Sequence, residues 1–182
     1  PPDNTAPGSL GIRCTQINLH HAAHANLSLE QWMHSSKMDV GLLQEPYLSR
    51  NKVSGFKDFN VFRGATFGKI RAAVITKKSV NAWLLNQFSD PDQVAISIKM
   101  KNKTIVLASV YMPYDSIDPP PSNLLKNLVK FCKEKRFEIL ISTDANSHHT
   151  SWGSSNINHR GEKLLEFILS NELFILNQGS QP

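Results

Sequence analysis

Two short motifs far apart in the chain carry acids and amides where apolar runs end. Gln44-Glu45-Pro46 follows the run 40–43, and Asp144-Ala145-Asn146-Ser147-His148-His149 follows the run 138–142. Proteins with mixed α/β architecture place reactive groups just past the carboxyl ends of buried strands. Carboxylates and amides gathered there suit a divalent cation and the activation of water against a phosphate. The two motifs therefore predict a metal-dependent phosphodiesterase.

Length and net charge indicate the size of the domain and the kind of molecule that it binds. The 182 residues are enough for one domain with a sizeable core, and 40% of them are hydrophobic. The 20 Lys and Arg outnumber the 15 Asp and Glu, which gives a net charge of +5. An excess of this size serves solubility as readily as attraction to a polyanion. Together with phosphate chemistry, it leads us to expect double-stranded DNA as the partner.

The cysteines and the apolar runs indicate where the protein works. Cys14 and Cys132 lie in apolar patterns without metal-ligand spacing, which is typical of a reducing compartment. The first residues lack the basic and apolar regions of a signal peptide, and no apolar run is long enough for a bilayer. We expect an intracellular, soluble protein with no membrane partner and no small-molecule cofactor.

Periodicity predicts the elements that position the two motifs. Alternating or continuous apolar runs predict strands at 12–19, 40–45, 59–63, 72–76, 82–88, 94–100, 104–111, 138–144 and 173–177. Apolar stripes predict helices at 28–36, where Ser28 and Gln31 have capping-box form, at 122–135 and at 161–172, and 148–159 is expected to be a loop. Lys101-Asn102-Lys103 fits a hairpin turn.

These elements predict an α/β fold of two mixed, mainly antiparallel β-sheets packed face to face, with helices outside. Residues 1–11 are rich in Pro, Gly and Ser, so we expect a disordered N-terminal segment there. Residues 12–182 are expected to form one domain.

Six motifs in order carry a family resemblance. They are Gln16-Ile17-Asn18, Gln44-Glu45-Pro46, Arg71-Ala72-Ala73-Val74-Ile75, Val110-Tyr111-Met112-Pro113, Asp144-Ala145-Asn146-Ser147-His148-His149 with Trp152-Gly153, and His159-Arg160-Gly161. From residue 12 onward the chain resembles the exonuclease/endonuclease/phosphatase superfamily, specifically the apurinic-endonuclease-like domain that non-LTR retrotransposons carry ahead of their reverse transcriptase. The resemblance implies a DNase I-like, four-layer α/β sandwich. Ser142-Thr143 before Asp144 looks most like the clade that inserts into ribosomal DNA or telomeric repeats.

Two departures from the family pattern stand out. Thr143 occupies a position where many relatives have glycine, while the acid and the amide that follow are kept. The family also ends with strands carrying an aspartate and a Ser-Asp-His segment, and the chain stops at Pro182 before any such residues. The resemblance therefore implies an endonuclease domain that lacks its C-terminal strands.

The resemblance implies a role for each site residue. Glu45 and Asn18 would hold Mg²⁺, with Mn²⁺ as the alternative, and Asp144 would orient or deprotonate the attacking water. Asn146 would bind the phosphate and place Asp144, and Tyr111 would contact the phosphate. Simpler interpretations remain open, because Asn18 could only form a turn, Tyr111 could only pack, and Asp144 with Asn146 could form a cap or an Asx-turn.

Basic residues and histidines complete the set of candidates. The candidate contacts to DNA phosphates, each of which could instead be a solvated charge, are Arg71, Arg160, Lys69, Lys77 and Lys78. His148 and Trp152 are expected to support their loop. The remaining candidates, expected to be surface residues without ligand spacing, are His20, His21, His24 and His34.

The leading hypothesis is a nuclear, Mg²⁺-dependent endonuclease that nicks DNA. The resemblance implies that its 3′-hydroxyl product primes reverse transcription by a reverse transcriptase domain of the same polyprotein. An abasic-site repair endonuclease, or another phosphoesterase of the superfamily, is the alternative enzyme. A catalytically incomplete DNA-binding module is the alternative of another class.

Overall fold

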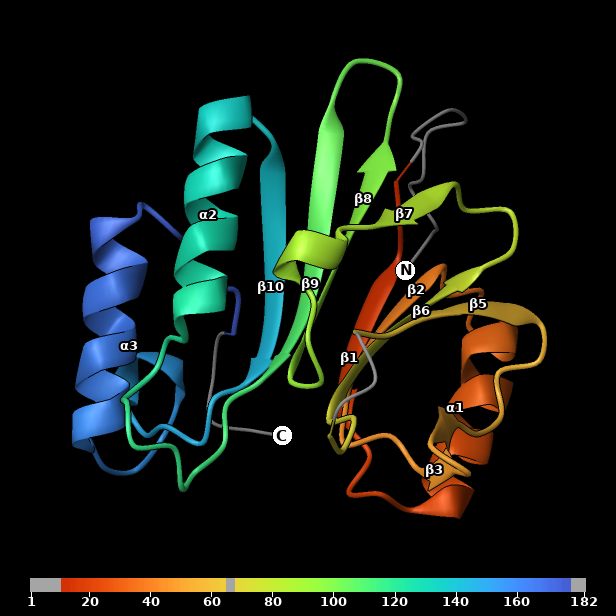
Figure 1. Cartoon of the computed structure of the whole chain (residues 1–182), viewed down its shortest axis with the longest axis horizontal. Helices are drawn as coiled ribbons and strands as arrows, with labels where there is room; N and C mark the ends of the chain where they lie inside the picture. Colours follow the sequence, from red (N-terminus) through yellow and green to blue (C-terminus); the bar gives the residue numbers. More distant parts are fainter. Residues whose placement is uncertain (1–10, 65–67, 178–182) are drawn as a thin grey trace, which may run out of the picture.

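The computed structural model describes residues 11–64 and 68–177, in which two four-stranded sheets pack face to face between helices (Figure 1). Apart from Gly11, the segment expected to be disordered lies outside these residues. None of the helices in the described ranges has the length and apolar character needed to cross a membrane. The predicted fold class, a DNase I-like α/β sandwich, is confirmed.

The first sheet positions Glu45, which directly follows one of its strands. Its order is β1 (Cys14–Asn18), β2 (Val40–Gln44), β6 (Ala72–Lys77) and β5 (Phe59–Phe62). β1 and β2 are parallel and joined by α1 (Ala23–Ser35), whereas the other pairs are antiparallel. Leu29 and Met33 of α1 pack on Leu43 and Ile75 of the sheet. Because β1 and β2 run in the same direction, their carboxyl ends lie at the same edge.

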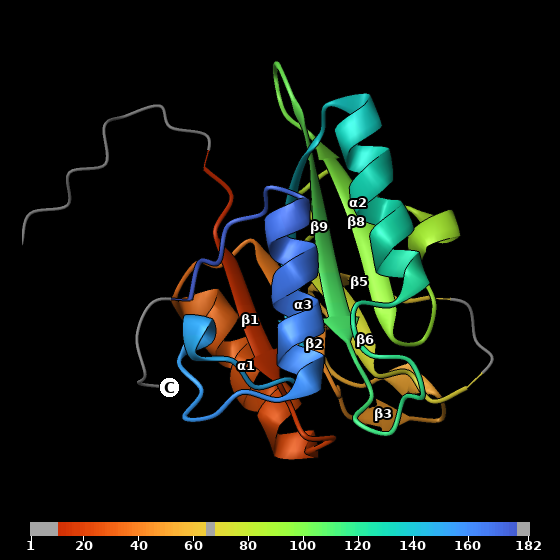
Figure 2. The same cartoon turned by 90° about the vertical axis from the view of Figure 1, so that its left-hand side faces the viewer.

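The second sheet also contains a parallel pair of strands, one of which ends at Asp144. Its order is β10 (Glu138–Asp144), β9 (Thr104–Tyr111), β8 (Gln93–Lys99) and β7 (Ala82–Leu84). β9 and β10 are parallel and joined by α2 (Asn123–Lys135). In Figures 1 and 2, α2 and α3 (His159–Ser170) cover the outer face of this sheet. Short elements complete the chain: β3 (Leu48–Ser49), β4 (Lys52–Val53), η1 (Asn86–Phe88) and η2 (Thr150–Trp152).

Apolar side chains fill the space between the two sheets. Val40, Leu42 and Val74 of the first sheet belong to one buried cluster with Ile96 and Leu107 of the second. Burial of this kind stabilises the sandwich, but it is non-directional and specifies only loosely how one sheet is placed on the other. The exact placement of the two strand ends therefore needs directional contacts.

The start of α1 corrects one prediction. The helix begins at Ala23, so the expected start at Ser28 is wrong and Ser28 lies within the helix. The buried positions of α1 begin with Asn26, a polar residue whose Nδ2 donates to the carbonyl oxygens of Tyr47 (3.2 Å) and Ser54 (2.8 Å). A polar residue at a core-facing position concealed the first turn from hydrophobic periodicity.

Two predicted strands are also corrected. The segment 173–177 is not a strand, and its Phe174 and Leu176 side chains are 89% and 71% exposed. An apolar run becomes a strand only where a neighbouring strand satisfies its backbone groups. The segment 82–88 ends as a strand at Leu84 and turns into η1, which brings the Phe88 ring to 5.0 Å from that of Phe131 on α2.

The first turn of α3 lies directly against the loop that follows Asp144. A Cβ atom added at Gly161 would overlap the carbonyl oxygen of His148. The Asn158 side chain caps α3 by accepting from the Gly161 N–H (2.8 Å), and it also accepts from the His148 N–H (3.1 Å). Only glycine permits this close approach of helix and loop.

We expect Gly161→Ala to lower the free energy of unfolding by about 1–3 kcal/mol, the usual cost of forcing extra volume into a packed site. Urea denaturation measures the change. Gly11→Ala is the matched control, because its Cβ would meet nothing within 4 Å. Equal stability of the two variants would show that α3 and the loop do not pack as described.

Candidate active site

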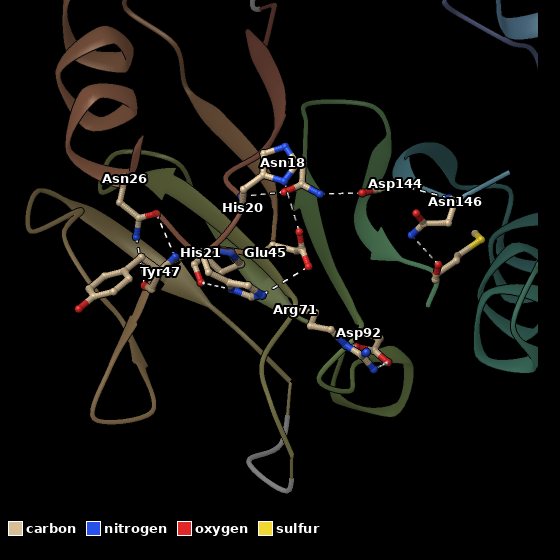
Figure 3. A network of polar contacts seen from close by, with 12 residues as sticks. Asn18, His20, His21, Asn26, Glu45, Tyr47, Arg71, Asp92, Asp144 and Asn146 are labelled. Carbon is tan, nitrogen blue, oxygen red and sulfur yellow. Dashed lines mark hydrogen bonds and ion pairs between the residues drawn. The ribbon is translucent and has the colours of Figure 1, made fainter. Parts of the chain in front are cut away.

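The carboxyl ends of the parallel strands from both sheets meet at one end of the molecule. Asn18 ends β1 and Asp144 ends β10, and the Asn18 Nδ2 donates to the Asp144 Oδ2 at 2.6 Å (Figure 3). Glu45 directly follows β2, the neighbour of β1. Residues separated by most of the chain thus lie together.

Glu45 is held firmly by its own backbone. Its N–H donates to the carbonyl oxygen of Arg71 (2.8 Å), and its carbonyl oxygen accepts from the His21 N–H (2.8 Å). Its φ of +46° lies in the left-handed region, which a non-glycine residue occupies at a cost and most often at functional sites. The carboxylate is directed toward two imidazoles, with its Oε2 3.7 Å from the His20 Nδ1 and its Oε1 3.4 Å from the His21 Nε2.

Asp144 forms the Asx-turn considered from the sequence, and it also faces the first sheet. Its Oδ1 accepts from the backbone N–H of Asn146 (3.3 Å), while its Oδ2 accepts from Asn18. Asn146 has a φ of +46°, and its Nδ2 donates to the carbonyl oxygen of Met112 (3.1 Å). The turn fixes the carboxylate rather than replacing its role in the site.

The pKa of Tyr111, at the end of β9, is affected by burial and by both acids. Burial raises the pKa of its hydroxyl, and the charges of Glu45 and Asp144 raise it further, outweighing the opposing effects of Arg71 and Asn146. The Arg71 guanidinium lies 5.1 Å from the centre of the Tyr111 ring. At neutral pH the hydroxyl therefore keeps its proton and can donate a hydrogen bond to an anion.

The buried side-chain amide of Gln44, the residue before Glu45, connects the two sheets. Gln44 is fully buried, and its Nε2 donates to the Oγ atoms of Ser109 (2.9 Å) and Ser142 (3.3 Å) in the other sheet. The Ser109 hydroxyl donates in turn to the Leu43 carbonyl oxygen (2.7 Å). Gln44 belongs to one of the sequence motifs, but no role was predicted for it from the sequence. A glutamine inside an otherwise apolar strand is the feature that could have indicated a buried polar contact.

Among the candidate phosphate contacts, Arg71 and Lys69 lie at the site end of the first sheet. Arg71 makes a bidentate pair with Asp92, in which Nε–Oδ1 and Nη2–Oδ2 both measure 2.6 Å, and this hydrogen bonding raises the pKa of its guanidinium. Lys69 is exposed. Arg160 instead donates to the backbone carbonyl oxygens of Asn146 (3.1 Å) and Pro113 (2.9 Å), so it holds the Asp144 loop in place.

Lys77 and Lys78 are not brought to the site. Lys77 pairs in β6 with Phe59 of β5, at the opposite end of β6 from Arg71. Its Nζ donates to the Asp39 Oδ1 (2.9 Å) and to the Lys37 carbonyl oxygen (3.1 Å), just before the amino end of β2. Burial opposes ionisation of Asp39, but the Arg13 N–H and Lys77 outweigh it and lower its pKa.

The histidines divide into two groups. His148 and Trp152 support their loop as expected, through the His148 Nδ1 contact to Asn156 Oδ1 (2.8 Å) and the Trp152 Nε1 bond to the Ser147 carbonyl oxygen (3.1 Å). The expectation of a surface residue is wrong for His21, whose side chain is 27% exposed and faces Glu45. Linear spacing gave no sign of this contact, because the fold brings positions 21 and 45 together.

The donors at this site fit a hard divalent cation. Within the described ranges, no group of three or more His, Cys, Asp or Glu side chains forms a ready-made metal cluster. Mg²⁺ does not require one, since it commonly takes one or two carboxylates and keeps several waters. Glu45 supplies a carboxylate, and the Asn18 Oδ1 accepts one hydrogen bond from the His20 N–H (2.8 Å), which leaves it a further lone pair.

Comparisons with known proteins agree with this fold. Residues 105–182 match a family model described as endonuclease-reverse transcriptase. The endonuclease domain of TRAS1, a telomere-specific non-LTR retrotransposon, is 25% identical with a TM-score of 0.79, covering 94% of this chain and 76% of that one. An endonuclease/exonuclease/phosphatase family protein from Leptotrichia buccalis C-1013-b is 16% identical, with a TM-score of 0.53 and coverages of 90% and 74%. D. rerio TDP2, solved with a single-strand DNA product, is 13% identical, with a TM-score of 0.54 and coverages of 90% and 65%. No curated protein sequence matched.

The fold is the DNase I-like scaffold of the exonuclease/endonuclease/phosphatase superfamily. The family-model match over residues 105–182 and the likeness to the TRAS1 domain support a retrotransposon endonuclease of that superfamily.

We expect Gln44→Leu, which nearly keeps the side-chain volume, to lower the free energy of unfolding by about 1–3 kcal/mol, because the hydroxyls of Ser109 and Ser142 lose a buried partner. The same change at Gln31, an exposed position of α1, should cost less than about 0.5 kcal/mol. Chemical denaturation of both variants measures the difference. Similar costs would mean that Gln44 does not bridge the sheets.

Proposed function

We propose that this chain is a divalent-cation-dependent endonuclease that nicks double-stranded DNA in the nucleus and leaves a 3′-hydroxyl. That hydroxyl would prime reverse transcription by a reverse transcriptase domain of the same polyprotein. The observation that carries the proposal is the hydrogen bond between Asn18 and Asp144, which joins the acid of the second sheet to the site of Glu45. The family-model match and the likeness to the TRAS1 domain support it.

Glu45 and Asn18 would hold the cation, Mg²⁺ or alternatively Mn²⁺, which neutralises charge at the scissile phosphate when bound. Asp144 would orient the attacking water and accept its proton, and the hydrogen bonds from Asn18 and the Asn146 N–H to its two oxygens support this role. The protonated Tyr111 hydroxyl is placed to donate to a phosphate oxygen. The chain thus supplies positioning, a base and a donor around one phosphate.

The DNA backbone would lie across the site end of the first sheet. Exposed Lys69 lies two residues before Arg71, whose carbonyl oxygen accepts from the Glu45 N–H, whereas Arg160 is engaged in holding the Asp144 loop. The Ser142-Thr143-Asp144 sequence and the likeness to a telomere-specific element favour a target within telomeric or ribosomal repeats.

Plasmid nicking tests the role of Asp144. With Mg²⁺ present, Asp144→Ala should lower the rate of conversion of supercoiled to open-circular plasmid by about 10²–10⁴-fold, the usual contribution of a general base. Glu166→Gln is the control, since Glu166 lies on the exposed face of α3, where it pairs with Lys163.

Nicking at equal rates by the wild-type chain and Asp144→Ala would refute the role of Asp144 in orienting and deprotonating the attacking water. Absence of nicking by the wild-type chain, and also by a longer chain that includes the family's Ser-Asp-His segment, would favour the DNA-binding module. A strong preference for a duplex with an abasic site over an intact one would favour the repair-type enzyme, which needs an extruded nucleotide.

Salt dependence of DNA binding tests the placement of the DNA. Lys69→Ala should weaken binding and reduce the slope of log K against log [salt] by about 0.9, the loss of one phosphate contact. Lys78→Ala removes the same charge at the far end of β6 and should leave the slope unchanged. The slopes come from fluorescence anisotropy at several salt concentrations, and equal slopes for both variants would place the DNA elsewhere.

A further inference from the structure

The loop between β1 and α1 holds two histidines over Glu45. His20 and His21 have φ values of +46° and +54°, both in the left-handed region. The loop is braced on the first sheet, because the Leu19 N–H donates to the Gln44 carbonyl oxygen (2.9 Å) and the His21 N–H donates to that of Glu45. Two consecutive strained residues held by such contacts suggest that the imidazoles are placed for a purpose.

The environment of His21 determines which ring nitrogen carries the proton. Its Nδ1 lies 3.3 Å from the carbonyl oxygen of Pro46, which can only accept a hydrogen bond. With a cation beside Nε2, the proton of the neutral imidazole would lie on Nδ1, directed at the Pro46 carbonyl oxygen, and Nε2 would keep its lone pair. That Nε2 is buried, has no hydrogen-bond partner among the described residues, and lies 3.4 Å from the Glu45 Oε1 (Figure 3).

The buried His21 Nε2, which has no hydrogen-bond partner among the described residues, faces the Glu45 carboxylate at 3.4 Å, and burial without a partner is costly. A positive ion beside both groups removes this cost. Histidines that bind metals almost always donate their other ring N–H to a carbonyl or carboxylate, and the Pro46 carbonyl oxygen lies 3.3 Å from the His21 Nδ1. Imidazole nitrogens and carboxylate oxygens bind such ions at about 2.0–2.2 Å, so one ion can reach two donors that are 3.4 Å apart.

We propose that the His21 Nε2 is a ligand of the cation held by Glu45. This rests on the proposed function, since it refines the cation site named there. A mixed nitrogen and oxygen donor set favours first-row transition ions over Mg²⁺, which takes oxygen ligands. An imidazole ligand would accordingly raise the affinity of this site for ions such as Mn²⁺ relative to Mg²⁺. His20 is not part of it, because its side chain is 82% exposed and its Nδ1 lies farther from Glu45, at 3.7 Å.

Pulsed electron paramagnetic resonance of the chain with Mn²⁺, without DNA, tests this directly. The wild-type complex should show nitrogen modulation from a bound imidazole, which His21→Gln should abolish and the neighbouring control His20→Gln should keep. His21→Gln should also weaken Mn²⁺ binding by roughly 10–100-fold, while Mg²⁺ affinity from competition stays within about twofold. Absence of nitrogen modulation in the wild type, or its persistence in His21→Gln, overturns the proposal whether or not the variant is fully stable.

Glu45→Gln separates this inference from the proposed function. If Mn²⁺ binding survives Glu45→Gln, the cation site itself is misplaced and the proposed function fails with it. If Glu45→Gln abolishes binding while His21→Gln changes neither the modulation nor the affinity, only the role of His21 is refuted. An ion pair between a protonated His21 and Glu45 would give that second result.

Discussion

The register between the two sheets is the constraint on which the site depends. Apolar packing holds the sheets together but tolerates small shifts, whereas hydrogen bonds in a buried, low-dielectric interface do not. Gln44 makes such bonds to Ser109 and Ser142. Gln44 immediately precedes Glu45, and Ser142 lies two residues before Asp144, so one buried side chain sets the relative positions of both acids.

The loops around the acids are held by the same kind of contact. Glu45 and Asn146 both occupy the left-handed region, and backbone hydrogen bonds fix both residues. The Asn146 side chain also donates to the Met112 carbonyl oxygen, whereas the Glu45 carboxylate takes no part in fixing its own backbone. The Arg160 guanidinium donates hydrogen bonds to the backbone carbonyl oxygens of Asn146 and Pro113 and so holds the Asp144 loop. Positioning residues of this kind leave the carboxylates free for a cation, water and phosphate, which is how preorganised sites lower the cost of reaching a transition state.

Sequence patterns predicted the elements that bury apolar side chains, and with them the strand ends that carry Glu45 and Asp144. They failed where a residue departs from its usual environment. Asn26 lies at a core position because two carbonyl oxygens satisfy it, so the first turn of α1 was missed. The run at 173–177 has the composition of a strand but leaves Phe174 largely exposed. The contact of His21 with Glu45 arises only from the fold, and no linear pattern encodes it.

The central claim is that strand ends from both sheets form one cation site. Broadening of backbone amide signals in NMR spectra by substoichiometric Mn²⁺ tests this most directly, because the paramagnetic effect falls steeply with distance. The account predicts that the signals of Glu45 and Asp144, which belong to different sheets, broaden together and ahead of all other acidic residues. Broadening confined to one sheet, or strongest at exposed acids such as Glu134, would contradict it.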